Sequence, residues 1–290
     1  MITYQSVAEM IELAGDGTLS DVVLADQAAL LEVPEAEVLA RMKDTLDIMR
    51  RSAQEGLKPD TRSISGLSGG DGYKMHKFAA TGKSLGGSFC ANATALAIAI
   101  QEYNAAMGKI VAAPTAGSCG ILPAGVLTMM DERGISEEAA IKALITAGAI
   151  GMVIATNATV SGAQGGCQAE CGSAAAMTAA ALVEMIGGRA NQAAHAAAIA
   201  LQNQMGLVCD PVAGLVEIPC ILRNGGGIAI AINAADLAMA GVESLIPLDE
   251  VITAMGEVGR ALPESLRETS LGGLAATPTG LAIKERLFGK

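Results

Sequence analysis

Apolar residues recur at helical spacing along most of this chain. In the N-terminal part, Val38, Met42, Leu46 and Met49 lie three or four residues apart, after a proline at position 34 that is typical of a first helical turn. The same pattern predicts helices over the ranges 5–56 (in several pieces), 88–107, 136–155, 172–187, 189–205 and 248–262. The predicted fold class is therefore all-α.

The helical pattern stops in loops that are rich in Gly, Ser and Thr, over residues 58–72, 113–123 and 269–280. The composition of the first loop would allow its backbone N–H groups to bind an anion. It is equally typical of an ordinary surface loop. The second places small hydroxyl residues before a helix, which is typical either of a carboxylate seat or of a tight inter-helix turn. Residues 225–233 alternate as a strand would, but their Ala- and Gly-rich surroundings favour the start of a helix.

Composition favours closely packed helices. Hydrophobic residues make up 51% of the chain and charged residues 17%, with no Trp, so Ala, Leu, Ile, Val and the 14 Met must fill the core, and the 35 Gly allow close backbone approach. We expect a single Ala/Gly-rich helical catalytic domain over residues 58–290, preceded by an N-terminal helical arm over residues 1–57.

Charge and hydropathy narrow the range of partners. The net charge of −11 argues against nucleic acid and against an anionic membrane surface. The apolar segment 143–155 is shorter than the ~20 residues that span a bilayer, so we interpret it as a core helix. The first residues do not resemble a signal peptide, and we expect a cytoplasmic protein. Six cysteines in such a protein are more typical of free thiols or metal ligands than of disulfides.

Four of the six cysteines fall between residues 164 and 224. Cys167, Cys171, Cys209 and Cys220 each lie at an element end marked by Gly or Pro, where stiff loops can hold thiolates around a buried metal. Zinc sites usually contain a C-x₂-C pair, whereas the close pair here is C-x₃-C. An iron–sulfur cluster accepts dispersed cysteines, and with three ligands it leaves one iron open. The spacing therefore favours an iron–sulfur cluster over zinc, held by a subset of the four.

Other catalytic motifs are scarce. Residues 82–84 resemble the end of a phosphate-binding loop, but Lys77 stands where that motif requires its earlier glycine. His76 and His195 are the only imidazoles, and His76 is the better candidate for a site contact because it directly follows the first Gly/Ser loop. His195 lies in an Ala-rich helix, and this position favours a structural or surface role for it over a catalytic one. Cys90, in another small-residue helix, is expected to be a core thiol.

Several motifs resemble the α chain of the iron–sulfur-dependent L-serine dehydratases, the L-serine ammonia-lyases. In order, they are Ser65-Gly-Leu-Ser-Gly-Gly-Asp, Ala113-Pro-Thr-Ala-Gly-Ser-Cys-Gly-Ile-Leu-Pro, Gly166-Cys-Gln-Ala-Glu, Gly206-Leu-Val-Cys-Asp-Pro-Val-Ala-Gly, Glu217-Ile-Pro-Cys-Ile-Leu-Arg-Asn and Leu271-Gly-Gly-Leu-Ala-Ala-Thr-Pro-Thr-Gly. The resemblance implies an all-α catalytic domain with a [4Fe–4S] cluster held by Cys167, Cys209 and Cys220. It leaves out Cys171, which stands where relatives often carry an apolar residue.

The resemblance also implies how a substrate is held and converted. The open iron would bind the hydroxyl of L-serine and help it leave while a base removes the Cα proton, and pyruvate and ammonia would be the products. The residues expected to bind substrate are Thr115, Gly117 and Ser118, with Ser65 and Ser68 behind them.

The resemblance further implies a partner. In the family the proposed base is a histidine of a β region, which these 290 residues lack, so we expect a separate β chain, a heterodimer and a higher oligomer, and we assign no catalytic residue here. Some single-chain relatives place a C-terminal cysteine on the open iron. This chain ends in Leu287-Phe-Gly-Lys, so we expect no such ligand.

Three other functions remain open. A related iron–sulfur lyase of another small amino acid, such as an L-cysteine desulfidase, would use the same three ligands. A zinc-stabilised non-catalytic scaffold would use the thiolates for structure alone. A pyridoxal phosphate enzyme would need Lys74 or Lys83 as its Schiff base, but the α/β pattern expected around such a lysine is missing.

Overall fold

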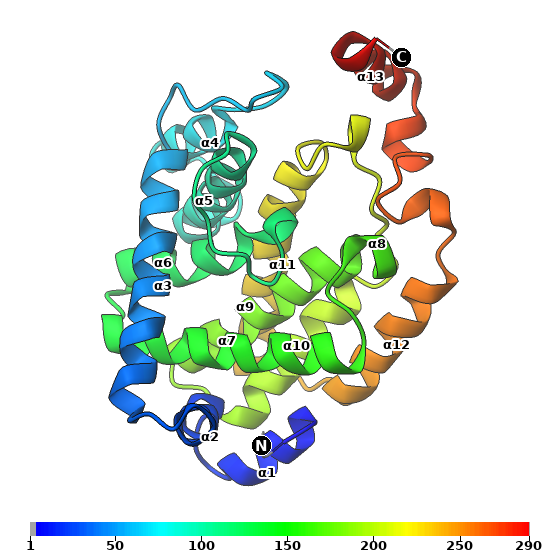
Figure 1. The fold of residues 1–290 in the computed structure, drawn as a ribbon. Coiled ribbons are helices and arrows are strands. Elements are labelled where there is room, and N and C mark those ends of the chain that lie inside the picture. The colour runs from blue at the N-terminus through cyan, green and yellow to red at the C-terminus, as the bar shows by residue number, and fades with distance from the viewer. Residues whose placement is uncertain (1–3, 290) are drawn as a thin grey trace.

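The chain folds into helices throughout the residues that the computed structural model describes, 4–289 (Figure 1). The α-helices are α1 (Val7–Ala14), α2 (Leu19–Leu31), α3 (Glu35–Gly56), α4 (Asp71–Ala79), α5 (Gly87–Ala105), α6 (Ile121–Arg133), α7 (Glu137–Asn157), α8 (Gly162–Gly165), α9 (Ser173–Met185), α10 (Ala190–Asn203), α11 (Cys220–Met239), α12 (Leu248–Ala261) and α13 (Pro278–Phe288). Single turns of other helix types are η1 (Ala116–Ser118), η2 (Gln168–Gly172), η3 (Val212–Gly214), η4 (Glu264–Leu266) and η5 (Gly273–Ala276). The all-α prediction is confirmed, since this part of the chain contains no β-strand.

Most predicted helices occur where the sequence placed them. Ser136 accepts a hydrogen bond from the backbone N–H of Ala139 and so caps α7, as a serine before two glutamates suggests. Residues 225–233 are helical as expected, although α11 begins upstream of them, at Cys220. The loop predicted over 269–280 is wrong at its end, because the hydroxyl of Thr277 caps α13 there.

Helix α9 forms the centre of the molecule. It packs against α6, α7, α10 and α11, and nearly all of its residues are buried. Alanine dominates α9, and small residues let the neighbouring backbones approach closely. Where α6 crosses α9, a Cβ atom added to Gly125 would lie only 2.7 Å from Thr178 Cγ2. Ala and Gly residues therefore allow close contact where the core helices cross.

Helix α7 is longer than the apolar segment that predicted it. It has 21 residues, because it starts at the Ser136 cap and continues past Thr156, so the shortness of segment 143–155 was a wrong argument against a membrane span. By length and composition α7 is able to cross a membrane, but 67% of its apolar window is buried inside the protein, against α2, α3, α6 and α9. That burial is typical of a core helix.

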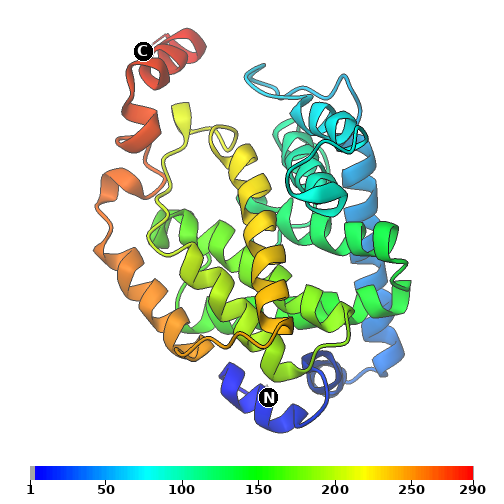
Figure 2. The same ribbon diagram turned by 180° about the vertical axis from the view of Figure 1, so that it is seen from behind.

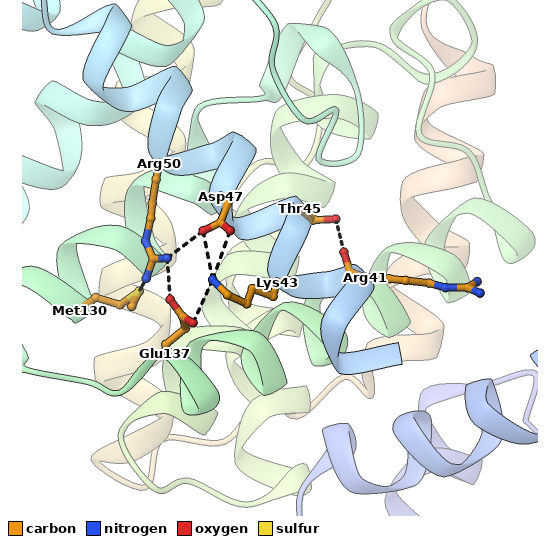
Figure 3. Close-up of polar contacts among 7 residues, drawn as sticks. All are labelled: Arg41, Lys43, Thr45, Asp47, Arg50, Met130 and Glu137. Atoms are coloured by element: carbon orange, nitrogen blue, oxygen red, sulfur yellow. Dashed lines mark hydrogen bonds and ion pairs between the residues drawn. The ribbon is translucent and has the colours of Figure 1, made fainter. Parts of the chain in front are cut away.

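The N-terminal helices pack onto the rest of the chain. Leu46 and Met49 of α3 are buried in the same hydrophobic cluster as the core of α7 and α9. At the surface, Arg50 lies 2.6 Å from Glu137 of α7 and 3.0 Å from Asp47, and Lys43 completes this ionic network (Figure 3). The division into an arm (1–57) and a catalytic domain (58–290) remains a prediction.

The two ends of the chain lie at opposite ends of the molecule. Helices α1 and α2 lie at the bottom of Figure 1 and α13 at the top, and Figure 2 shows the same arrangement from behind. After α12 the chain runs along one side of the core through η4 and η5 to α13. This segment supplies contacts to the cysteine loops described next.

Candidate metal centre

Cys167 and Cys171 lie in a tight bend that precedes the central helix. Gly166 adopts a positive φ of 77°, and Cys167 then opens the π-helical turn η2, which is a wider turn than an α-helix. The two sulfur atoms lie 3.4 Å apart and both residues are buried. The buried amide of Gln168 fixes this bend, because it donates to Gly165 O and accepts from the N–H of Gly206.

Cys209 lies in the extended segment between α10 and α11. Its backbone N–H donates to Leu266 O at 2.9 Å, and its carbonyl accepts from the N–H of Glu268 at 2.7 Å. The next residue, Asp210, is buried and pairs with Arg223 of α11 at 2.8 Å. These contacts hold the Cys209 segment between α11 and the chain that follows α12.

Cys220 is the first residue of α11, and Asn224 follows one turn later. The buried Asn224 amide donates to the carbonyls of Cys220 and Gly117, each at 2.8 Å, and its oxygen accepts from the N–H of Gly120 at 2.9 Å. One side chain therefore joins the Cys220 turn to the loop of residues 113–120.

The loop of residues 113–120 contains three of the residues predicted to bind substrate. Its Ala116–Ser118 portion forms η1, immediately before α6. The Thr115 hydroxyl donates to Glu170 Oε1 at 2.8 Å and lies 3.2 Å from the Ser118 hydroxyl. A Cβ atom on Gly117 would lie 3.1 Å from the same Glu170 oxygen. The structure thus brings Thr115, Gly117 and Ser118 together against Glu170, which stands between the two cysteines of η2.

Ser65 and Ser68 belong to a different wall of the site. Their hydroxyls donate to the two carboxylate oxygens of the buried Glu217, at 2.7 and 2.6 Å. Glu217 in turn precedes the Cys220 turn. Within this loop Leu67 and Ser68 use their backbone N–H groups for bonds to serine hydroxyls, so the loop is closed on itself. A role in binding substrate remains a prediction for both serines.

The charges around the thiols are unevenly distributed. The hydrogen bond between Cys167 and Cys171, helped by the positive charge of Arg223, lowers the pKa of Cys167. Burial and the neighbouring Cys167 raise the pKa of Cys209, and the same causes raise the pKa of Cys220 to about 12. The hydrogen bond to Cys167 and complete burial raise the pKa of Cys171. Cys167, Cys209 and Cys220 are therefore close enough to influence one another electrostatically.

The donor set fits an iron–sulfur cluster by its chemistry. All six cysteines are free thiols, and soft thiolates are the ligands that such clusters use. In the protein chain alone, no group of three or more His, Cys, Asp or Glu side chains within residues 4–289 is arranged as a metal site. The ligand set Cys167, Cys209 and Cys220 remains a prediction.

Neither histidine adjoins these thiols through a hydrogen bond within the described part of the chain. His195 accepts a bond from the N–H of Ser244 at 3.2 Å, at the other end of α10 from the cysteine loops, as a structural role predicts. A separate pocket is lined by His76 of α4, Asn92 of α5 and Glu132 of α6. His76 is therefore a weaker candidate for a site contact than its place after the Gly/Ser loop suggested.

Sequence reasoning assigned no role to four residues that organise the site: Glu170, Glu217, Arg223 and Asn224. Each one contacts a loop far away in the sequence, so no local spacing identifies it. Their sequence signal is that all four lie within two of the motifs that resemble the serine dehydratases, at residues 166–170 and 217–224.

The fold and the site define a class: a helical protein in which buried thiols meet a hydroxyl-bearing loop at a helix N-terminus. The chain matches the family described as serine dehydratase alpha chain over residues 14–275. It is 47% identical to the probable L-serine dehydratase alpha chain of Bacillus subtilis over 288 residues, which cover 99% of this chain and 96% of the relative. It is 48% identical to the L-serine dehydratase alpha chain of Peptoniphilus asaccharolyticus over 264 residues, 91% of this chain and 90% of the relative.

A longer relative matches over a smaller share. The L-serine dehydratase TdcG of Escherichia coli is 47% identical over 182 residues, which are 62% of this chain and 40% of that protein. The chain belongs to the serine dehydratase alpha chain family, and the resemblance seen in its motifs is confirmed. Its relatives are enzymes, and this chain is accordingly part of an enzyme.

Proposed function

We propose that this protein is the α chain of an L-serine dehydratase, a lyase that converts L-serine to pyruvate and ammonia. One observation carries the proposal: the hydroxyl-bearing loop of residues 113–120 is fastened to the cysteine segments by Glu170 and Asn224. A substrate bound on this loop would therefore lie beside the thiols. The comparisons do not favour the alternatives of a desulfidase or a zinc scaffold.

We further propose that Cys167, Cys209 and Cys220 hold a [4Fe–4S] cluster. When bound, the cluster would supply an open iron, a Lewis acid toward the substrate hydroxyl. Burial of the thiols keeps water away from the proposed cluster site, and the cation Arg223 lies beside Cys167. Arg223 also donates to Val208 O at 2.7 Å and pairs with Asp210, so it fixes both residues that flank Cys209.

The residues of the 113–120 loop would hold the substrate. The hydroxyls of Thr115 and Ser118 lie just before the N-terminus of α6, where the helix dipole favours a carboxylate. Gly117 lies so close to Glu170 that a side chain there would press against its carboxylate. Ser65 and Ser68 would support the site from behind, through Glu217.

We propose that the base which the reaction also needs comes from outside this chain. Removal of the Cα proton and loss of the β-hydroxyl give aminoacrylate, which tautomerises and hydrolyses to pyruvate and ammonia. Neither His76 nor His195 adjoins the thiols, so we propose that a β chain brings a histidine to the open side of the site. The working enzyme would then be a cytoplasmic heterodimer or a larger assembly of such pairs, acting in serine degradation.

An anaerobic serine-to-pyruvate assay, with and without a co-expressed β chain, tests this proposal. We expect pyruvate to form only when both chains are present, and we expect exposure to air to abolish the activity. Activity that survives air and depends on pyridoxal phosphate would contradict the proposal. So would a two-chain protein with its full iron and sulfide content that does not convert L-serine.

A further inference from the structure

Glu170 is a carboxylate at the site whose contacts within the described residues include no cation. It is partly exposed and stands between the predicted substrate loop and the predicted ligand Cys209. Its Oε1 accepts from Thr115 at 2.8 Å, and its Oε2 lies 3.8 Å from the Cys209 thiol. Within residues 4–289 it forms no ion pair with lysine, arginine or histidine.

Two other acidic side chains near the site have different partners and are more deeply buried. Asp210 pairs with Arg223 and also accepts from the N–H of Leu274. Both oxygens of Glu217 accept serine hydroxyls. A half-buried carboxylate without a cation is costly to keep charged, and a cation that arrives in the functional state offsets that cost. Of these three carboxylates, Glu170 is the one that is partly exposed and contacts both the 113–120 loop and the Cys209 thiol.

Glycine backbone packs closely against this carboxylate. A Cβ atom on Gly162 would lie 2.6 Å from Glu170 Oε2, and one on Gly117 would lie 3.1 Å from Oε1. Glycine at both positions therefore allows the carboxylate to lie between Thr115 and the sulfur of Cys209.

We propose that Glu170 binds the α-ammonium group of the amino-acid substrate and so selects amino acids over hydroxy acids. This inference rests on the proposed function and deepens it. An α-amino acid carries an ammonium group with three N–H donors next to its carboxylate. With the ammonium on Glu170 and the carboxylate near the N-terminus of α6, Cα would lie between these residues and the thiols. Glu170 then sets the orientation of the substrate.

The test compares ligands that differ only in the ammonium group. L-alanine and propanoate both lack a leaving group, so neither reacts, and their binding to the anaerobic two-chain enzyme is measurable by titration calorimetry. For Glu170→Gln we expect the dissociation constant of L-alanine to rise by about tenfold or more, since a hydrogen bond to a charged partner is lost. The dissociation constant of propanoate should change by less than about twofold.

Matched variants and kinetics complete the experiment. Glu170→Asp keeps the charge and should restore part of the L-alanine affinity, whereas Glu257→Gln removes an exposed carboxylate on α12 and should change neither ligand. In turnover, Glu170→Gln should raise KM for L-serine more than it lowers kcat. Equal weakening of L-alanine and propanoate, or a loss confined to kcat with both affinities unchanged, would overturn the inference. Turnover of L-serine by the wild-type enzyme in the same preparation tests the proposed function separately.

Discussion

The buried cysteines are held in place by different local structures. Cys209 is fixed by two backbone hydrogen bonds to the chain after α12, and Cys220 by the Asn224 amide one turn along α11. Cys167 and Cys171 instead share one π-helical turn, with their sulfur atoms 3.4 Å apart. Three separate segments therefore supply the thiols of Cys167, Cys209 and Cys220. Cys171 lies in the same turn as Cys167.

This arrangement leads to a prediction about the ligand set. Cys209→Ser should lose the iron–sulfur chromophore and the activity together, because an alcohol is a poor ligand for soft iron. Cys171→Ser is the matched control, since it changes an equally buried thiol outside the predicted set, and it should keep both. Visible absorbance of anaerobically purified protein measures the outcome. Retained cluster absorbance in Cys209→Ser would show that the ligand set is wrong.

A second prediction concerns Glu184, a carboxylate away from the site. Burial raises the pKa of Glu184 above its ordinary value of 4.5, although its oxygen accepts from the N–H of Ser20 and from the Thr146 hydroxyl. The folded protein therefore binds this proton more tightly than the unfolded chain does. Its contribution to stability is fully present below pH 4.5 and is lost as the pH rises through the raised pKa.

The measurement is denaturant unfolding of the wild type and of Glu184→Gln at neutral and acidic pH. The stability of the wild type relative to Glu184→Gln should increase as the pH falls from 7 toward 4.5. A difference between the two proteins that stays constant over this range would contradict the assigned shift.

At the residue scale the sequence could identify chemistry but not partners. Thiol number and spacing predicted a metal site, and the family motifs singled out Thr115, Gly117 and Ser118, which the structure brings together. Glu170 and Glu217 were not predicted, because their partners lie on loops distant in the sequence. The hydroxyls of Ser65 and Ser68 were expected to face a substrate, and no sequence pattern shows that they donate to Glu217.

At the scale of elements, the small residues allow the helices to pack closely. Helix α6 approaches α9 so closely that Gly125 has no room for a methyl group beside Thr178. On α7, by contrast, Gly148 is exposed and a Cβ atom there would meet nothing within 4 Å. Both glycines lie inside helices, so they differ mainly in their surroundings.

These two glycines give a matched pair of substitutions. Gly125→Ala should destabilise the protein by about 1–3 kcal/mol, because overpacking forces α6 and α9 apart. Gly148→Ala should stabilise it by about 0.5–1 kcal/mol, because alanine loses less backbone entropy in a helix. Midpoints of denaturant unfolding measure both effects. Equal effects of the two substitutions would show that the α6–α9 crossing tolerates the added methyl group.

Periodicity predicted the elements well wherever caps and apolar spacing agreed, as at Ser136 for α7 and at Leu248 for α12. It failed for α4, which directly follows the Gly/Ser loop. That helix is held by tertiary contacts, since the buried Glu102 of α5 accepts from its first two N–H groups. The start of α11 at Cys220 was likewise not predicted, because cysteine is not a residue that marks the start of a helix.

At the scale of the whole molecule, the candidate site collects segments from the entire length of the chain after α3. The loop of residues 58–70, the loop of residues 113–120, the π turn, the Cys209 segment and the chain after α12 all meet near the start of α11. The core helices beneath them position these loops. Within residues 4–289 neither histidine hydrogen-bonds to the thiols of this site, which is where the proposed β chain would bring its histidine.

The central prediction is that this chain carries an iron–sulfur cluster on three of its cysteines. The most direct measurement is the iron and acid-labile sulfide content of the anaerobically purified protein, with zinc determined in the same sample. A bound [4Fe–4S] cluster predicts about four iron and about four sulfide per chain. Zinc bound to the chain without labile sulfide would contradict the claim.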